Sequence, residues 1–240
     1  MEIKEFREIL MEYLKTMDIK LNDEQIQKFY KYMELLLEWN EKINLTAIIE
    51  PKEIILKHFV DSLTIAKYIK EKDRLIDVGT GAGFPGIPLK ILRPDIKVTL
   101  VDSLNKRINF LNEVIEKLNL EDIVTVHSRI EDFGKNKSYR EKFDYVTARA
   151  VANLAVLSEY LIPIAKIGGK CVCMKGSNVE EEITSGKNAI NVLGGKLEKV
   201  DEFVLPDSDI SRNVIILSKI KNTPARFPRK AGMPSKEPLK

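Results

Sequence analysis

The sequence is poor in the residues that build metal centres, disulfide frameworks and membrane spans. It has two cysteines and two histidines among 240 residues. The cysteines, Cys171 and Cys173, stand one residue apart on a predicted strand, and we expect their side chains on opposite faces, without a disulfide. A single Cys-x-Cys provides no zinc site. No apolar run approaches the ~20 residues that cross a bilayer, and the N-terminus is not typical of a signal peptide. We therefore expect a cytoplasmic protein with no metal and no membrane partner.

Net charge is also small, at +3, but it is unevenly placed. Residues 221–240 carry six basic side chains and one acidic one, a balance of +5, which leaves the first 220 residues at about −2. A basic, proline-containing tail on a near-neutral body suggests a polyanionic partner. The alternative is a tail that only improves solubility.

The chain divides into three parts by pattern. Residues 1–70 carry apolar stripes at helical spacing, and Asn22 or Asp23 can cap the second helix, so we expect an N-terminal helical cap. Residues 71–220 alternate between strands and helices, which predicts a mostly parallel sheet. Residues 221–240 form the basic tail. The predicted strands are 74–78, 97–102, 123–127, 143–148, 169–174, 196–205 and 212–220. No helix separates the last two, so we expect an antiparallel hairpin at one edge.

A glycine-rich stretch follows the first predicted strand. Gly79, Gly81 and Gly83 stand at alternate positions, and Pro85 and Pro88 fit the first turn of a following helix. Free N–H groups at that helix start, at the carboxyl end of a parallel strand, predict a ligand site. Gly81-x-Gly83-x-x-Gly86 also fits a nicotinamide dinucleotide site, and a loop that only packs helix on strand remains a further alternative.

Two acidic residues narrow the choice of ligand. Asp77 precedes the first glycine by two residues, and Asp102 ends the second predicted strand, where a carboxylate can hold ribose hydroxyls. The pair resembles the class I S-adenosylmethionine (SAM) methyltransferases. That resemblance implies a Rossmann-like α/β fold with a seven-stranded sheet and a reversed last strand, which the predicted hairpin favours over a dinucleotide fold. It also places Ile130 beside the adenine, with Glu131 or Asp132 as an acceptor for its amino group.

Three charged or titratable residues are further candidates. Arg149 directly follows the fourth predicted strand, at the carboxyl edge of the sheet. A charge there needs a partner, which could be the methionine carboxylate, Asp77, a substrate phosphate or a structural ion pair. His58 and Asp61 are one helical turn apart. They could line the pocket, or they could only form a local hydrogen bond.

Missing motifs indicate which atom would be methylated. Neither cysteine stands in a loop where it could add to a pyrimidine ring, and the chain has no Pro-Pro of the kind that accompanies exocyclic amines. An alcohol would need a base, for which only His127 remains as a candidate. A neutral ring nitrogen such as guanine N7 needs positioning and no deprotonation. We therefore expect no catalytic side chain.

Seven motifs together are similar to one family, that of ribosomal RNA small subunit methyltransferase G, also called glucose-inhibited division protein B. They are Asn44–Thr46, His58–Leu63, Asp77–Pro88, Val101–Arg107, Thr147–Ala150, Lys175-Gly176 and Pro228–Gly232, with Ala231 where members commonly have proline. The resemblance implies SAM-dependent N7 methylation of a guanine in small-subunit (16S) ribosomal RNA (rRNA processing that yields 7-methylguanosine). With the loop residues, the implied cofactor contacts are Asp77, Gly79, Gly81, Gly83, Phe84, Asp102, Ile130, Glu131 and Arg149.

Basic residues around these motifs are candidates for RNA binding through phosphates. They are Lys106, Arg107, Arg129, Lys175, Arg226, Arg229 and Lys230. The expected partner is small-subunit rRNA or the 30S particle, and we expect a monomer. Two other functions stay open: a non-catalytic, RNA-binding ribosome-assembly factor, and a small-molecule methyltransferase.

Overall fold

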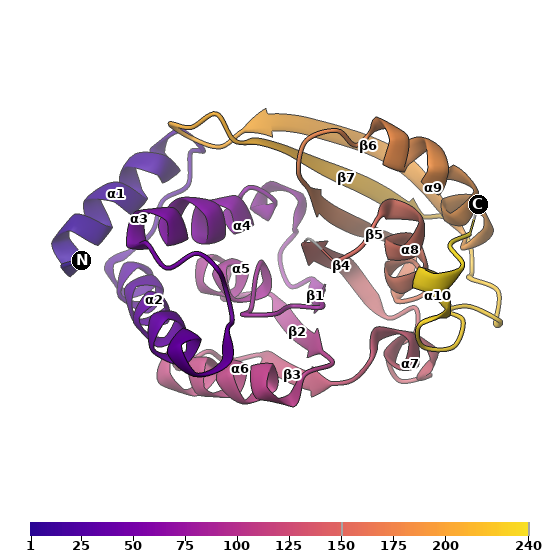
Figure 1. Cartoon of the computed structure of the whole chain (residues 1–240), viewed down its shortest axis with the longest axis horizontal. Coiled ribbons are helices and arrows are strands. Elements are labelled where there is room, and N and C mark those ends of the chain that lie inside the picture. The colour runs from indigo at the N-terminus through magenta and orange to yellow at the C-terminus, as the bar shows by residue number, and fades with distance from the viewer. Residues whose placement is uncertain (150, 240) are drawn as a thin grey trace.

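The computed structural model describes residues 1–149 and 151–239. Ala150, the last residue of the Thr147–Ala150 motif, and Lys240 of the basic tail lie outside the described residues. Within the described chain, one seven-stranded sheet lies between two layers of helices (Figure 1).

The sheet has the strand order β3-β2-β1-β4-β5-β7-β6. Its strands are β1 (Arg74–Val78), β2 (Lys97–Asp102), β3 (Ile123–His127), β4 (Phe143–Arg149), β5 (Ala165–Lys175), β6 (Gly195–Val204) and β7 (Ser211–Lys219). Strand β7 runs antiparallel to both β5 and β6, whereas the pairs among β1 to β5 are parallel. This confirms the predicted sheet with its reversed last strand. The carboxyl ends of β1, β2 and β4 therefore meet at one edge, where such sheets bind ligands.

Ten α-helical segments are present among the described residues. They are α1 (Ile3–Lys15), α2 (Asp23–Ile43), α3 (Pro51–Ile54), α4 (Asp61–Leu63), α5 (Gly86–Leu92), α6 (Asn105–Lys117), α7 (Ile130–Lys135), α8 (Leu154–Leu161), α9 (Glu180–Val192) and α10 (Met233–Lys236). A π-helical stretch, Ile55–Val60, joins α3 to α4, and a short 3₁₀ turn spans Ala66–Tyr68. Helices α1, α2, α5 and α6 share one buried apolar cluster with one face of the sheet, and α7, α8 and α9 share another with the opposite face.

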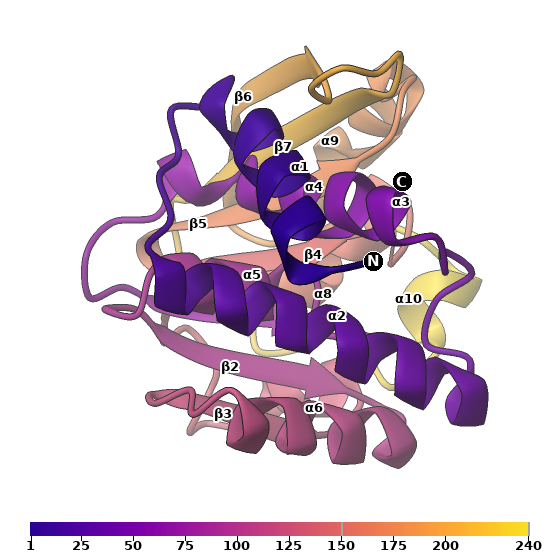
Figure 2. The ribbon, with the colours of Figure 1, turned by 90° about the vertical axis from the view of Figure 1, so that its left-hand side faces the viewer.

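The N-terminal helices lie in front of the sheet in Figure 2. Helix α2 begins with a capping box, in which Asn22 and Gln25 each accept a hydrogen bond from the other's backbone N–H. From the middle of α2, the buried Tyr32 hydroxyl donates to the carbonyl of Ala82 in the glycine loop. The helical cap therefore supports the ligand-binding edge directly. The boundaries 1–70, 71–220 and 221–240 remain a prediction.

The expectation for the cysteines was wrong in one respect. Cys171 and Cys173 are free and buried, but both lie in the apolar cluster on the α8–α9 side of the sheet. Side chains two positions apart on a strand share a face because the pleat alternates with a period of two. Burial raises the pKa of both thiols. Both cysteines therefore remain protonated and behave as small apolar core residues.

Candidate cofactor site

The glycine loop turns sharply between β1 and α5. Gly79, Gly81 and Gly83 have φ values of +64°, +61° and +98°, a region that favours glycine. A Cβ added at Gly81 would meet no atom of residues 1–149 and 151–239 within 4 Å, because that position faces open space. Gly86 is tighter, since a Cβ there would lie 2.4 Å from the Leu100 side chain. The loop thus leaves room for a ligand above Gly81 and packs closely below, at Gly86.

Asp77 holds this loop in shape. Its side chain is fully buried, and its Oδ2 accepts hydrogen bonds from the Thr80 hydroxyl at 2.6 Å and the Gly86 N–H at 2.9 Å. Oδ1 is buried and has no hydrogen-bond partner among the described residues. Burial raises the pKa of this carboxyl to about 6. Asp77 does not line the cavity above the loop, so it can contribute to a ligand site only by holding the loop in its conformation.

A cavity of about 460 Å³ opens over the loop between β1, β2 and the helical cap. Its wall contains Gly79, Gly81, Phe84, Asp102 and Arg149, all predicted cofactor contacts. Asp102, at the end of β2, is 3% exposed. Its Oδ2 accepts from the Gly81 N–H at 3.0 Å and from Arg107 at 3.3 Å, and its Oδ1 accepts from the Leu104 N–H at 2.9 Å. The carboxylate is thereby fixed where a ribose could be held.

A second cavity, of about 380 Å³, continues from Asp102 toward α7 and α8. It shares Gly79, Asp102, Ser103 and Val151 with the first. Ile130 and Glu131, the predicted adenine neighbours, line it, as do Tyr160 and Gly232, which the sequence did not suggest. Asp132, the alternative acceptor, is exposed and lies outside it. Glycine loop, fixed carboxylate and elongated two-part cavity together fit a nucleoside with a charged extension, as in SAM.

The first cavity has one end near α7, and Arg149 closes the opposite end. Its guanidinium donates to the Lys57 carbonyl at 3.0 Å and to Asp61 at 3.1 Å, and it lies 4.9 Å from the Phe84 ring centre. Asp61, 3% exposed, also accepts a hydrogen bond from Arg212 at 3.0 Å. Of the partners considered from sequence, Arg149 thus forms the structural ion pair, and Asp77 is not its partner. Lys57 and Asp61 both lie on the helical stretch from α3 to α4. His58 and Asp61 are one turn apart there, so both side chains reach Arg149.

His58 lines the cavity and has both ring nitrogens in hydrogen bonds. Arg149 lies 3.0 Å from Nδ1, and Thr46 Oγ1 lies 2.8 Å from Nε2. The ring stacks on Phe84 with 4.4 Å between centroids. Burial, with the nearby Arg149 charge, lowers the pKa of His58 to about 3. His58 is therefore a neutral wall of the cavity at physiological pH.

The predicted RNA-binding residues fall into two groups. Lys106, Arg129, Arg226 and Lys230 are exposed. The other three already have carboxylate partners: Arg107 pairs with Asp102, Lys175 with Glu182 at 2.6 Å, and Arg229 with the buried Glu159 at 2.7 Å. Phosphate contact remains a prediction for both groups, and Arg107 and Arg129 also line the two-part cavity.

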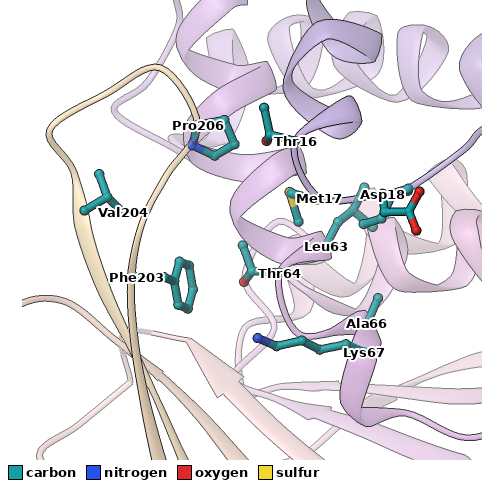
Figure 3. Close-up of a pocket in the computed structure, with 11 residues that line it drawn as sticks. Thr16, Met17, Asp18, Leu63, Thr64, Ala66, Lys67, Phe203, Val204 and Pro206 are labelled. Carbon is teal, nitrogen blue, oxygen red and sulfur yellow. The ribbon is translucent and has the colours of Figure 1, made fainter.

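Another cavity, of about 650 Å³, lies between the helical cap and the β6–β7 hairpin (Figure 3). Met17, Leu63, Phe203 and Pro206 contribute to its mainly apolar wall. None of the predicted site residues lines it. In the described chain no helix is long and apolar enough to cross a membrane, and no cluster of three or more His, Cys, Asp or Glu side chains could hold a metal ion.

The sheet order with its reversed β7 is that of the class I SAM-dependent methyltransferases. A SAM-dependent methyltransferase from Aquifex aeolicus shares this fold, with a TM-score of 0.52 at 19% identity, over 70% of this chain and 93% of the other. So does a SAM-dependent O-methyltransferase from Thermotoga maritima, with a TM-score of 0.51 at 17% identity, over 79% and 72%. At these identities the likeness concerns the fold alone.

Sequence comparison resolves the family within that class. The family described as rRNA small subunit methyltransferase G (GidB) matches residues 25–214. A protein of Acetivibrio thermocellus named ribosomal RNA small subunit methyltransferase G is 56% identical over 234 residues, which are 97% of this chain and 96% of the relative. A protein of that name from Desulforamulus reducens is 53% identical over 232 residues, 96% and 97% of the two chains. This chain therefore belongs to the rRNA small subunit methyltransferase G family, which confirms the resemblance seen in its motifs and its assignment as a SAM-dependent rRNA methyltransferase.

Proposed function

We propose that this protein methylates N7 of a guanine in small-subunit rRNA, with SAM as methyl donor. SAM supplies a methyl group on a sulfonium, and a ring nitrogen with a free lone pair can accept it without losing a proton. What the protein must then provide is position. Gly79, Gly81, Asp102 and Ile130 would hold the cofactor, and the end of the cavity at Phe84, His58 and Arg149 would face the base.

The hydrogen bonds and the pKa of His58 are the observation that supports N7 as the methylated atom. A general base needs a lone pair directed at the substrate and a pKa near the working pH. His58 has neither, because Arg149 occupies Nδ1, Thr46 occupies Nε2, and the pKa is lowered to about 3. His127, the only base candidate from the sequence, lies 3.0 Å from the Ser103 carbonyl and lines neither half of the two-part cavity. Such a site favours a nucleophile that needs no deprotonation.

The test is methyl transfer from labelled SAM to small-subunit rRNA that lacks the modification, supplied both as naked RNA and as assembled subunit. Labelled 7-methylguanosine after nucleoside analysis supports the proposal. Label on another nucleoside contradicts the argument about the base. SAM binding without label on either RNA substrate favours one of the two alternatives, the assembly factor or the small-molecule methyltransferase.

We also propose that the protein acts as a monomer in the cytoplasm. Analytical ultracentrifugation at micromolar concentration tests the oligomeric state, and a sedimenting dimer would contradict it.

A further inference from the structure

The C-terminal segment, defined here as residues 223–237, folds against α7 and α8, as Figure 1 shows. Its first part is fixed by Arg140, which donates to the carbonyls of Phe227 at 2.6 Å and Thr223 at 2.8 Å. Gly134 in α7 permits a close approach, since an added Cβ would lie 3.0 Å from the Pro228 ring. The basic tail is thus packed and hydrogen-bonded against the rest of the protein.

The same segment forms hydrogen bonds with two side chains that line the adenine side of the cavity. Glu131 Oε1 accepts a hydrogen bond from the Gly232 N–H at 2.8 Å, and the Tyr160 hydroxyl lies 2.9 Å from Ser235 Oγ. Gly232 itself is part of the wall. Helices α7 and α8 are therefore bridged across this side of the cavity by the C-terminal segment.

Arg229 is the strongest anchor of the segment. Its Nε lies 3.0 Å from Glu159 Oε1 and its Nη2 lies 2.7 Å from Oε2, while its backbone N–H donates to Oε1 at 2.7 Å. Glu159 is 1% exposed, so these charge-assisted bonds form largely away from water. The hydrogen bonds to Glu159 raise the pKa of Arg229 further. Arg229 lines neither half of the two-part cavity, so it can act on a ligand there only through the segment.

We propose that Arg229 is a positioning residue for the cofactor: by holding the C-terminal segment on Glu159, it keeps Gly232, Glu131 and Tyr160 in place as the wall around the purine of SAM. The inference rests on the proposed function, because the purine is assigned to this side by Ile130 and Glu131, the predicted adenine neighbours. It also changes the role that the sequence suggested for Arg229, from phosphate contact to support of the purine pocket.

The experiment is a calorimetric titration of the full-length protein with S-adenosylhomocysteine, which carries the same purine, in the absence of RNA. Arg229→Gln is expected to raise the Kd about tenfold, and Arg229→Lys, which keeps one charged donor, to raise it less. Lys236→Gln is the matched control, because Lys236 is exposed on the same segment, and its Kd is expected to equal that of the wild type. An unchanged Kd for Arg229→Gln would overturn the proposal.

Arg229→Gln also leaves Glu159 buried without its cation, so a second variant separates positioning from damage to the fold. Ser235→Ala removes one exposed hydroxyl that bonds to Tyr160, and it is expected to raise the Kd about twofold at unchanged thermal stability.

Steady-state kinetics distinguish the two roles of Arg229. A positioning role raises KM for SAM and leaves KM for RNA unchanged, whereas a phosphate contact does the reverse and would refute the inference. Failure of the wild type to bind S-adenosylhomocysteine would instead refute the proposed function.

Discussion

Arg149 Nη2 lies 3.0 Å from Nδ1 of His58, and this contact fixes the protonation state of the histidine. A guanidinium can only donate, so Nδ1 accepts, and the proton of the neutral ring is on Nε2. Nε2 then donates to Thr46 Oγ1, which in turn accepts from the Ile48 N–H at 3.0 Å. The loop after α2, the π-helical stretch and β4 are thereby joined beside the cofactor cavity.

This contact predicts that His58 reduces stability in acid. Its pKa is lowered from 6.5 to about 3 in the folded protein, so below pH 6.5 only the unfolded chain takes up the proton. The histidine's contribution to stability is full above pH 6.5 and is lost as the pH falls toward 3. The loss is about 1.4 kcal/mol per pH unit, or about 2 kcal/mol at pH 5.

Urea denaturation of the wild type and of His58→Gln between pH 8 and pH 4 measures this contribution. Asp77 acts in the opposite direction, because its raised pKa of about 6 makes the folded state gain stability as the pH falls below that value. The difference between the two proteins isolates His58, since Asp77 is common to both. A difference that stays constant from pH 8 to pH 4 would contradict the neutral, buried histidine.

A second prediction concerns Asp61, which is shared by two arginines. Arg149 and Arg212 are 17% and 24% exposed in their side chains, against 4% for Asp61. Asp61→Asn keeps the shape but leaves both guanidinium groups without their carboxylate. We expect a loss of about 3 kcal/mol in the free energy of unfolding, the lower end for a broken buried pair, because both arginines reach water.

Asp209→Asn is the matched control for Asp61→Asn, as Asp209 is exposed and no ion pair involves it among the described contacts. Its free energy of unfolding is expected to stay within about 0.5 kcal/mol of the wild type. Equal stability of the two variants would mean that Asp61 contributes little to the fold.

Much of the fold was predictable because its signals are local. Strands β1, β2 and β3 match the predicted ranges, since short apolar runs between turn residues leave little freedom. The antiparallel β6–β7 hairpin followed from the missing helix between two strands. Strand β5 begins at Ala165, earlier than expected, because Lys166, Ile167 and Gly168 extend it at an exposed end where no apolar pattern marks the start.

The site was less predictable because its contacts join distant parts of the chain. The glycine loop and Asp102 belong to two separate local motifs, and each contributes to the wall of the cavity. Nothing in the sequence links Arg229 to Glu159 or Gly232 to Glu131, since those pairs are separated by 70 and 101 positions. Composition showed that the tail is basic, but the carboxylate that would neutralise one of its charges lies in an apolar helix, α8.

A third prediction concerns Asp102. All three of its protein partners donate to the carboxylate. Asp102→Asn replaces one acceptor oxygen by an NH₂ group, which then faces the N–H of Gly81 or Leu104. Asparagine also removes the charge that would accept the ribose hydroxyls, and a hydrogen bond to a charged group contributes about 2 kcal/mol, so we expect about a thirtyfold weaker Kd for SAM. Asp95→Asn, which removes a carboxylate that also pairs with an arginine, Arg93, but lies away from the cavity, is expected to bind SAM normally in the same calorimetric assay.

The last prediction uses two glycines of similar conformation to separate strain from ligand contact. Gly81 and Gly168 have φ values of +61° and +80°, and a Cβ at either would meet nothing within 4 Å. Alanine at either position is therefore expected to cost about 1 kcal/mol of stability, from the left-handed backbone alone. Only Gly81 faces the cofactor cavity, whereas Gly168 is exposed near the start of β5.

Gly81→Ala should in addition weaken SAM binding, because its methyl group occupies space that the ligand needs. Overpacking by one methyl group costs about 1.4 kcal/mol, or a tenfold higher Kd, whereas Gly168→Ala should bind as the wild type does. Thermal unfolding with and without SAM measures both quantities in one experiment: the two variants share the shift without ligand, and Gly81→Ala alone loses part of the ligand-induced shift. If both variants lost it equally, the effect would come from backbone strain, and the open space above Gly81 would not be where the cofactor lies.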